Sequence, residues 1–542
     1  MAGRIPQTIS GETFDAVIVG AGVNGCGVAR DAALRGLRVL LLDKGDVASG
    51  TTAASTRLIH GGLRYLEHGE VGLVRESLRE RETLLRRVAP HLVRPLPMLV
   101  PVYAGRRRGA LTLRAGMVAY DALSAGKSLP RHRMLDAAGA LARAPGLDAR
   151  GLRGAALFYD AQVEFAERLA LENALAARAS GATVLTYARV ERLLAGGGVA
   201  RGVEFKDLLG GETHEARARV VLNAAGPWVD DVLEGSGARG ERLIGGTKGS
   251  HLVVKPFRGA PAVAVYAEAH ADGRPFFVVP WDGKFLIGTT DERYEGDLDR
   301  VVADARETDY LLSETNRAFP AARLSREDVL YTCSGVRPLP RVDARSEGAV
   351  TRRHFVRPSR VRGLYSVVGG KLTTYRSLSE EVVDLLFRQL GKTSPPCATA
   401  STPLPGAAVE DFAAFRRDFA ARSPLPRAST DRLVRVYGVR AAEVLRLAQG
   451  DTELSRPLSE ETGSIRAEVV YAFRDEMAET LTDCMMRRTM VGLNSEVGLD
   501  ALDEAARVAQ KFLGWDTPRA AREVEDYIKF VERFHPRQNR GR

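Results

Sequence analysis

A short stretch near the N-terminus, GGLRYLE at residues 61–67, combines residue types that suit the binding of a ligand. Gly61 and Gly62 carry no side chain, so the backbone can approach another group closely at this point. Arg64 and Tyr65 follow, and they supply a fixed cation beside an aromatic hydroxyl. The stretch therefore predicts a close approach of the backbone to a ligand that a cation stabilises.

The element that must hold such a ligand begins a little earlier, with a strand, a tight turn and a helix. Residues 17–19 are apolar and predict a buried strand, which leads directly into Gly20, Gly22 and Gly25 in a G-x-G-x-x-G motif. The first glycine suits the turn, the second lets the backbone reach a pyrophosphate, and the third lets helix and strand pack closely. The positive end of the helix dipole then faces the phosphates.

A second apolar strand is expected over residues 39–42, and it ends on Asp43. An acidic residue about twenty positions after the glycine motif is placed to accept a hydrogen bond from a ribose hydroxyl. Strand, turn, helix, strand and acid in this order predict a dinucleotide site. A glycine-rich structural turn is the alternative.

Two later segments favour FAD over NAD. A strand over residues 220–222 leads into Ala225 and Gly226, and a strand over 364–368 leads into Gly370 and a helix. Glycines at a helix N-terminus suit the anionic end of a reduced flavin ring. Three approach points spread along the chain suit a long, extended ligand.

The motifs together closely resemble one family. They are VIVGAGVNGCGVARDAALRGLRVLLLD, TTAASTRLIHGGLRYLEHGE, NAAGPWV, KGSHLVV, IGTTD, SGVRPL and VGGKLTTYR. The chain resembles the FAD-dependent glycerol-3-phosphate dehydrogenases of the D-amino-acid-oxidase-like flavoprotein superfamily, strongly over residues 11–392 and more loosely over 400–500. Asp43 stands where relatives often have Glu, and NAAGPW has Ala where many have Thr, but neither change removes an acceptor or a close approach.

The resemblance implies FAD as the cofactor, bound without a covalent bond, because no Cys or His stands in a recognisable flavin-linkage motif. No metal site is indicated. The residues expected to bind the cofactor are Gly20, Gly22, Asn24, Gly25, Asp43, Thr52, Ser55, His60, Gly61, Gly62, Val190, Ala225, Gly226, Gly370, Lys371, Leu372 and Thr373.

The resemblance also places five residues around the substrate. Arg64, Tyr65 and Lys371 are expected to bind the phosphate or its neighbouring hydroxyl, Arg337 to polarise the C2 alcohol, and His251 to take its proton. These roles have alternatives. Arg64 and Arg337 could be solvated surface residues. His251 could be a satisfied core histidine, and Lys371 could mainly neutralise the charge of the reduced flavin.

The implied reaction is oxidation of sn-glycerol 3-phosphate to dihydroxyacetone phosphate by hydride transfer to the flavin, with a membrane quinone as electron acceptor. One alternative is an oxygen-dependent glycerol-3-phosphate oxidase that produces hydrogen peroxide. Another is a related amine or amino-acid oxidase, against which the several cations argue mildly. A flavin-binding sensor or scaffold without turnover is the alternative from outside the enzymes.

The expected fold is α/β, with a Rossmann-like FAD-binding domain, an inserted substrate domain built on a mixed sheet, and a helical C-terminal cap domain. The predicted FAD-binding domain takes residues 11–100, 153–243 and 360–392, and the substrate domain takes 101–152 and 244–359. Residues 393–407 are rich in Pro, Ser and Thr and predict a linker, and 408–542 predict the cap domain. Apolar residues at helical spacing predict one helix over 468–486, with one face in the core.

Composition is that of an ordinary globular protein, with 542 residues, 45% apolar and 27% charged. The four cysteines fall in no C-x-x-C pair, and no apolar run suits a signal or spanning segment, so a cytoplasmic enzyme is expected. The net charge of +10 suits an anionic lipid surface or simply reflects arginine usage; no nucleic-acid partner is expected. A homodimer is left open.

A quinone acceptor requires contact with the membrane, and residues 104–127 are the predicted docking segment at its inner face. Arg106, Arg107, Arg108 and Arg114 stand there beside several large apolar residues, namely Leu111, Leu113, Met117, Val118 and Leu123. The C-terminal HPRQNRGR could add charge as a second contact. The alternative is a buried helix of the substrate domain behind a basic loop, because the apolar residues do not keep to one face.

Overall fold

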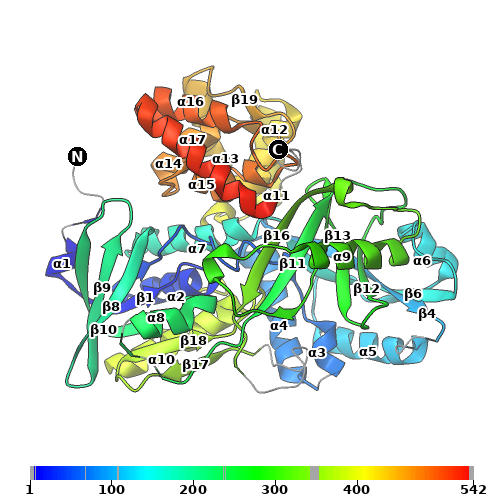
Figure 1. Ribbon diagram of the computed structural model, residues 1–542, viewed down its shortest axis with the longest axis horizontal. Coiled ribbons are helices and arrows are strands. Elements are labelled where there is room, and N and C mark those ends of the chain that lie inside the picture. The colour runs from blue at the N-terminus through cyan, green and yellow to red at the C-terminus, as the bar shows by residue number, and fades with distance from the viewer. Residues whose placement is uncertain are drawn as a thin grey trace.

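The computed structural model describes residues 5–6, 8–67, 69–105, 109–235, 237–238, 240–341 and 353–535. Two sheets lie side by side, and a group of helices from the last quarter of the chain lies across them (Figure 1). The fold is α/β with a helical C-terminal domain, which confirms the predicted fold class.

The first sheet is doubly wound around a strand from the N-terminal motif. Its strands follow the order β17 (Phe355–Pro358), β18 (Leu364–Val368), β10 (Thr213–Asn223), β1 (Thr13–Val19), β2 (Val39–Leu42) and β7 (Thr183–Leu185). β8 (Ala188–Gly196) and β9 (Val199–Asp207) extend it beside β10. Because β18, β10, β1, β2 and β7 run parallel, their carboxyl ends meet at one edge. Ligands bind at that edge in doubly wound folds.

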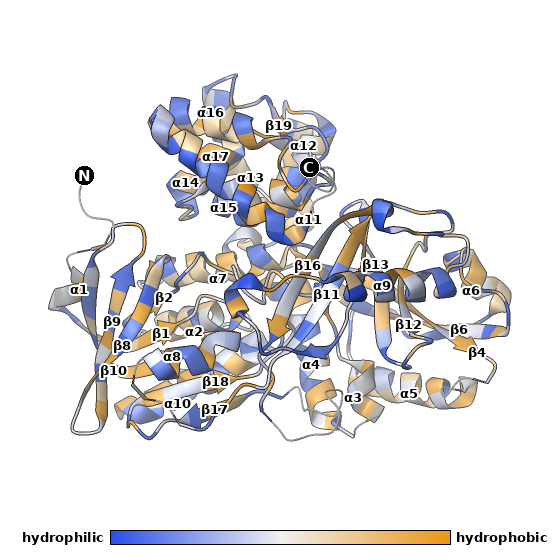
Figure 2. Cartoon of the chain, viewed as in Figure 1, coloured by the Kyte–Doolittle hydropathy of each residue, from blue (hydrophilic) through white to orange (hydrophobic). Residues whose placement is uncertain are grey.

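Three helices cover one face of this sheet: α2 (Val23–Leu34), α7 (Ala166–Ala179) and α10 (Tyr375–Leu390). Figure 2 shows apolar residues along the inner strands, and the core beneath the helices includes Ile18, Leu41 and Leu222. α2 packs closely on the sheet because it begins with small residues. A Cβ at Gly25 would lie 1.8 Å from the carbonyl oxygen of Gly20, so only glycine fits there.

The second sheet is mixed, as predicted. Its strands follow the order β15 (Glu292–Arg293), β11 (Thr247–Val254), β14 (Lys284–Gly288), β13 (Pro275–Trp281), β12 (Ala264–Glu268), β4 (Val93–Tyr103), β6 (Leu152–Val163) and β3 (Leu58–Ile59). β16 (Val329–Arg337) pairs with β11, and β5 (Arg133–Asp136) pairs with β6. Among the described strands of this sheet, β12 and β4 form the one parallel pair.

Two long strands of this sheet, β4 and β6, extend into segments that the prediction assigned to the FAD-binding domain. β4 begins at Val93, and β6 extends to Val163, whereas the prediction limited this part of the sheet to residues 101–152. The two strands pair antiparallel from Val93 opposite Val163 to Tyr103 opposite Leu152. The ends of two such strands are set by their pairing with each other, so neither segment of sequence shows by itself where β4 begins or where β6 ends.

Helices cover both faces of the second sheet. α3 (Leu63–Glu67), α4 (Val71–Thr83) and α5 (Ala110–Leu123) lie together in Figure 1, and α4 continues into a π-helical turn, η1 (Leu84–Val88). α9 (Ala305–Ala318) packs against β11 and β14. α6 (Ala137–Arg143) packs on β6.

In the domain of the first sheet, α8 (Val229–Gly235) follows a 3-10 turn, η2 (Gly226–Trp228), after β10.

The C-terminal domain is mainly helical. Its helices are α11 (Phe412–Arg422), α12 (Arg427–Tyr437), α13 (Ala441–Gly450), α14 (Ala467–Asp475), α15 (Leu481–Asp483), η8 (Cys484–Arg488), α16 (Leu502–Leu513) and α17 (Thr517–Val531). A short 3-10 turn, η10 (Glu532–Phe534), follows α17, and β19 (Pro457–Ser459) pairs with β20 (Ser464–Ile465).

The single helix predicted over 468–486 is broken. α14 ends at Asp475, and Met477 adopts a positive φ of 58° before α15 begins. Thr480 caps α15, since its side chain accepts from the backbone N–H of Asp483. Between the two helices the carboxylate of Glu476 binds Arg168 of α7 at 2.5 and 2.8 Å and Arg440 at 2.8 Å. The predicted core role of Val470, Leu481 and Cys484 agrees with their burial.

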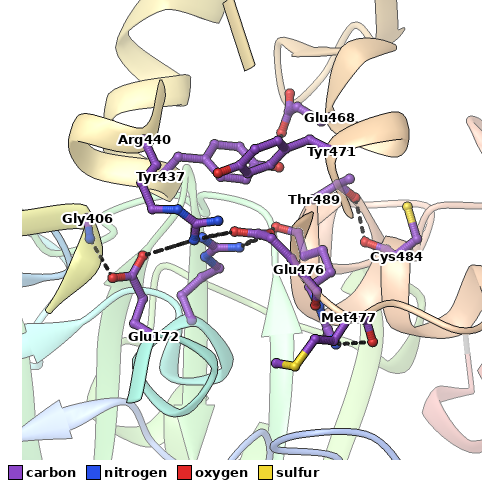
Figure 3. A network of polar contacts seen from close by, with 12 residues as sticks. Glu172, Gly406, Tyr437, Arg440, Glu468, Tyr471, Glu476, Met477, Cys484 and Thr489 are labelled. Atoms are coloured by element: carbon purple, nitrogen blue, oxygen red, sulfur yellow. Dashed lines mark hydrogen bonds and ion pairs between the residues drawn. The ribbon is translucent and has the colours of Figure 1, made fainter. Parts of the chain in front are cut away.

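This buried ionic junction, seen from close by in Figure 3, fastens the C-terminal domain to α7. Glu172 of α7 accepts a hydrogen bond from the backbone N–H of Gly406 at 2.6 Å. Arg168 also lies 4.7 Å from the centre of the Tyr437 ring. Removing one partner would leave a buried charge unpaired, so this junction holds the domain firmly.

Candidate active site

One cavity of about 870 Å³ lies where the three parts of the fold meet. The carboxyl edge of the first sheet, strands β14 and β16 of the second sheet, and the C-terminal domain all contribute to its wall. Its volume and its position at the carboxyl ends of parallel strands suit an extended dinucleotide.

The glycine motif forms the turn that the sequence predicts. Gly20 has a φ of 106°, and a Cβ there would lie 2.7 Å from the carbonyl oxygen of Ala224. Gly370, at the other end of the same sheet edge, has a φ of 100°, and a Cβ there would lie 2.6 Å from Nδ2 of Asn24. Both positions therefore require glycine for the backbones to meet at the cavity.

Two buried polar atoms at the cavity wall fit a polar ligand such as FAD. Oδ1 of Asn24 and Nε1 of Trp228 are buried and have no hydrogen-bond partner within the described ranges. Buried polar atoms are rarely left unpaired in folded proteins, so each is suited to a partner on the bound ligand. Asn24 is one of the residues predicted to bind the cofactor, whereas Trp228 is not, although it stands in the NAAGPWV motif.

Asp43 lies at the cavity wall in the predicted position. Its Oδ2 accepts from the backbone N–H of Ala21 at 2.5 Å, and its Oδ1 accepts from that of Gly45 at 2.8 Å. Burial raises the pKa of this carboxyl group, and the two backbone donors oppose that effect. The carboxylate keeps further lone pairs that can accept from a ribose hydroxyl.

Most of the residues predicted to bind the cofactor line the cavity. They are Gly20, Gly22, Asn24, Asp43, Thr52, Ser55, Val190, Ala225, Gly226, Gly370, Lys371 and Leu372. Gly25, His60, Gly61, Gly62 and Thr373 are not among the lining residues. Gly25 serves the packing of α2, and the backbone N–H of His60 donates to Oγ1 of Thr373 at 3.1 Å, which ties two predicted segments together.

The two glycines of GGLRYLE approach other parts of the protein. The N–H of Gly61 donates to the Tyr120 hydroxyl at 2.9 Å, and a Cβ at Gly61 would lie 2.5 Å from that oxygen. Gly62 has a φ of 77°, and a Cβ there would lie 2.1 Å from the Tyr65 ring. Packing therefore accounts for both glycines, and their predicted contact with the flavin stays a prediction.

Tyr65 and Lys371 lie together, as the predicted substrate site requires. Nζ of Lys371 lies 3.9 Å from the centre of the Tyr65 ring, which is a cation–π contact. Arg64 belongs to α3 between Leu63 and Tyr65, and its side chain lies outside what the structure describes. The contact links the helix start after β18 to α3.

Arg337 ends β16 and is held firmly on the second sheet. Its guanidinium binds Oδ1 of Asp291 at 3.0 Å and Oγ1 of Thr289 at 2.9 Å. Its neighbours Val336 and Pro338 line the cavity. The cation is therefore fixed beside the cavity wall.

His251 lies on β11, opposite Cys333 of β16 and Gly288 of β14, and only 2% of its surface is exposed. Its Nε2 lies 2.9 Å from Oγ1 of Thr56, and its Nδ1 has no hydrogen-bond partner in the described parts of the chain. Burial and the charges of Arg337 and Arg57 lower the pKa of His251 to about 3. The imidazole is therefore neutral at pH 7.

This shift predicts how the protein responds to acid. The folded-state pKa lies below the ordinary value of 6.5, so the unfolded chain binds the proton more readily. The stability from neutral His251 is fully present above pH 6.5 and is lost as the pH falls toward 3. We expect the free energy of unfolding of His251→Gln to fall less steeply than that of the parent between pH 6.5 and 4. Chemical denaturation at a series of pH values measures both slopes, and equal slopes would contradict the assigned pKa.

Several lining residues were not identified from the sequence. Lys44 binds Asp299 of the second domain at 2.6 Å, while Arg487, Phe530 and Phe534 come from the C-terminal domain. No short motif marks them, because they reach the cavity only through the packing of distant segments. Among the described residues no group of His, Cys, Asp and Glu suits a metal ion, and no helix is long and apolar enough to cross a membrane.

The doubly wound first sheet carries the glycine turn, Asp43 and the cavity, and it is joined to the mixed second sheet. This combination is typical of a flavin-dependent oxidoreductase. Comparison with known proteins agrees. Residues 15–385 match the model of the FAD dependent oxidoreductase family, and residues 397–520 match that of the C-terminal domain of alpha-glycerophosphate oxidase.

Individual relatives are similar along almost the whole chain. A glycerol-3-phosphate dehydrogenase of Synechocystis sp. is 45% identical, with 97% of each chain covered. A D-erythritol 1-phosphate dehydrogenase of Brucella abortus is 40% identical, with 93% of this chain and 98% of the relative covered. The solved structure of the glycerol-3-phosphate dehydrogenase from Bacillus halodurans complexed with FAD has a TM-score of 0.80 at 30% identity, covering 97% of this chain and 96% of that one.

The chain therefore belongs to the FAD-dependent oxidoreductase family, in the branch of the glycerol-3-phosphate dehydrogenases. Its cofactor is FAD, as predicted.

Proposed function

We propose that the protein oxidises sn-glycerol 3-phosphate to dihydroxyacetone phosphate. The observation that carries this proposal is a neutral, buried His251 within electrostatic reach of the fixed cation of Arg337. These two residues are not among the lining residues of the cavity that fits FAD, but Cys333, opposite His251, and Val336, next to Arg337, line it. The 45% identity with a glycerol-3-phosphate dehydrogenase supports the choice of substrate. FAD, when bound, supplies the hydride acceptor.

Arg337 is the residue that would polarise the C2 alcohol oxygen. Asp291 and Thr289 hold its guanidinium from the side of the second sheet, so it need not reorganise during the reaction. Lys371 and Tyr65 would bind the phosphate end together with Arg64, because Lys371 supplies a cation and Tyr65 holds it in place.

His251 would take the proton of the alcohol, for which its neutral state is required. A pKa of about 3 makes the imidazole a weak base before the substrate binds. Arg337 and Arg57 contribute to that low value, and a bound phosphate dianion would offset their charge. Substrate binding would thus raise the pKa of His251 and strengthen the base when it is needed.

D-Erythritol 1-phosphate is a second candidate substrate, because a dehydrogenase of that compound is 40% identical along nearly its whole length. Both compounds present a phosphate and neighbouring hydroxyl groups to the same cations. The ratio of kcat/KM for the two purified compounds decides between them. A higher value for D-erythritol 1-phosphate would replace glycerol 3-phosphate in the proposal.

The electron acceptor is proposed to be a membrane quinone, on the resemblance to the family. The alternative is oxygen, as in a glycerol-3-phosphate oxidase. Turnover with a soluble quinone analogue, measured beside peroxide release in air, separates the two acceptors. Stoichiometric peroxide without quinone reduction would establish the oxidase.

Access to a quinone would need contact with the inner face of the cytoplasmic membrane, and α5 is the proposed docking element. Leu113, Met117 and Tyr120 of this helix are buried against the second domain. On its outer side Leu111 is 82% and Val118 54% exposed. Arg106, Arg107 and Arg108 just before the helix, and the C-terminal segment from Pro536 onward, lie outside the described residues. The helix thus has a buried inner face and exposed apolar residues on its outer side, which supports the proposal that it docks.

We expect the protein to float with anionic liposomes at low salt and to leave them as the salt concentration rises, since each basic residue near anionic lipid contributes about 1 kcal/mol. The double variant Leu111→Asn, Val118→Asn should lose most of this binding. Val409→Asn, which changes an exposed apolar residue on the loop before α11, is the control. Equal flotation of the three proteins would show that α5 does not dock.

A further inference from the structure

The loop that carries Asp43 belongs to the FAD-binding domain, but residues of the C-terminal domain help to hold it. It spans residues 43–48, directly after β2, and the backbone N–H of Ala48 donates to the carbonyl oxygen of Ala21 in the glycine turn at 3.0 Å. Asp43 itself is fixed by the N–H groups of Ala21 and Gly45. Turn and loop therefore form one unit, and the shape of the loop sets the position of the Asp43 carboxylate.

Asp46, in the same loop, is buried and binds two consecutive arginines of the C-terminal domain. Its Oδ2 accepts from Nε of Arg487 at 2.6 Å and from Nη1 of Arg488 at 2.7 Å. Its Oδ1 accepts from Nη2 of Arg488 at 2.7 Å. Both arginines belong to η8, more than four hundred residues further along the chain.

A second set of contacts closes the connection. Arg487 also binds Asp483 at 2.7 Å, and Asp483 accepts from the Tyr187 hydroxyl at 2.6 Å. The backbone N–H of Tyr187 donates to the carbonyl oxygen of Gly45 at 2.9 Å. Two buried carboxylates thus face two buried guanidiniums, and the loop touches this cluster at both Gly45 and Asp46.

We propose that Asp46 is a positioning residue through which the C-terminal domain holds the FAD-binding loop, so that FAD binding and docking of this domain strengthen each other. Such coupling is reciprocal, because a domain that favours the FAD-bound loop must itself be favoured by FAD. A buried charge that loses its partners is costly, which gives the contact the strength to transmit this effect.

The test compares two buried carboxylates that bind the same domain. Asp46→Asn should raise the dissociation constant of FAD at least about tenfold, because the amide cannot satisfy both arginines. Glu476→Gln weakens the junction of the C-terminal domain with α7 but keeps the contacts of Asp46, and it keeps the backbone carbonyl of residue 476 that accepts from Arg488, so it should raise that constant by a clearly smaller factor than Asp46→Asn does. Both variants should lower the melting temperature. An unchanged FAD affinity in Asp46→Asn, or an equal loss in both variants, would overturn the proposal.

A second measurement needs no variant. Hydrogen exchange of the parent protein, with FAD bound and after its removal, should show faster exchange in residues 478–490 of the C-terminal domain when FAD is absent. Exchange in α9, which takes no part in these contacts, serves as the internal reference. Identical exchange of 478–490 in both states would also overturn the proposal.

Discussion

Replacing Arg337 by alanine should lower kcat/KM for glycerol 3-phosphate by about one to two powers of ten or more, while the FAD content stays unchanged. A hydrogen bond to a charged group contributes about 1.5–3 kcal/mol, and each 1.4 kcal/mol is about a tenfold change in rate. Arg337 is held by Asp291 and Thr289 on the second sheet, away from the glycine turn, so its loss should spare the cofactor. Steady-state kinetics and the flavin absorbance of the purified variant give both quantities.

Arg326→Ala is the matched control. Arg326 lies just before β16, the strand that Arg337 ends, and its partner Asp309 is exposed. Its removal should leave kcat/KM within about threefold of the parent, since its ion pair with Asp309 is exposed to solvent and lies outside the cavity wall. If Arg337→Ala behaves like this control, Arg337 takes no part in the site.

Replacing Gly20 by alanine should abolish FAD binding. The φ of 106° is unfavourable for any residue with a Cβ, and the added atom would lie 2.7 Å from a backbone oxygen of Ala224. The neighbouring backbone cannot yield as a flexible side chain could, so the turn must open where the cofactor approaches it. The variant should purify without flavin, as judged from the flavin released by denaturation.

Gly36→Ala is the control, because it introduces the backbone strain of a positive φ without the close contact that a Cβ at Gly20 would make. Gly36 also has a positive φ, of 83°, but no atom lies within 4 Å of the position of its Cβ. This variant should lose about 1–2 kcal/mol of stability and keep a full complement of FAD. A Gly20→Ala protein that keeps its FAD would show that the cofactor does not approach the turn.

The parts of the site that the sequence predicts are those built from local geometry. Gly20, Gly22 and Asp43 belong to one strand–turn–helix–strand unit, whose residues follow each other closely in the chain, and all three line the cavity. Gly370 also lines the cavity, and it too lies between a strand and a helix, β18 and α10.

The features that the sequence did not predict depend on contacts between distant segments. The hydroxyl of Tyr120, almost sixty residues away, occupies the space beside Gly61, and the sequence alone does not indicate this contact. The helix expected over 468–486 is interrupted at Met477, beside Glu476, whose carboxylate binds Arg168 more than three hundred residues away. The spacing of apolar residues indicates which face of a helix or strand is buried, but it does not indicate which distant residues contact that element.

The most direct test of the proposed function is the anaerobic addition of glycerol 3-phosphate to the purified, FAD-loaded protein. We expect the yellow flavin absorbance to bleach in a single turnover, with one dihydroxyacetone phosphate formed for each flavin reduced. Arg337→Ala should bleach much more slowly under the same conditions. A flavin that stays oxidised with glycerol 3-phosphate, in protein that retains its FAD, would contradict the proposed function.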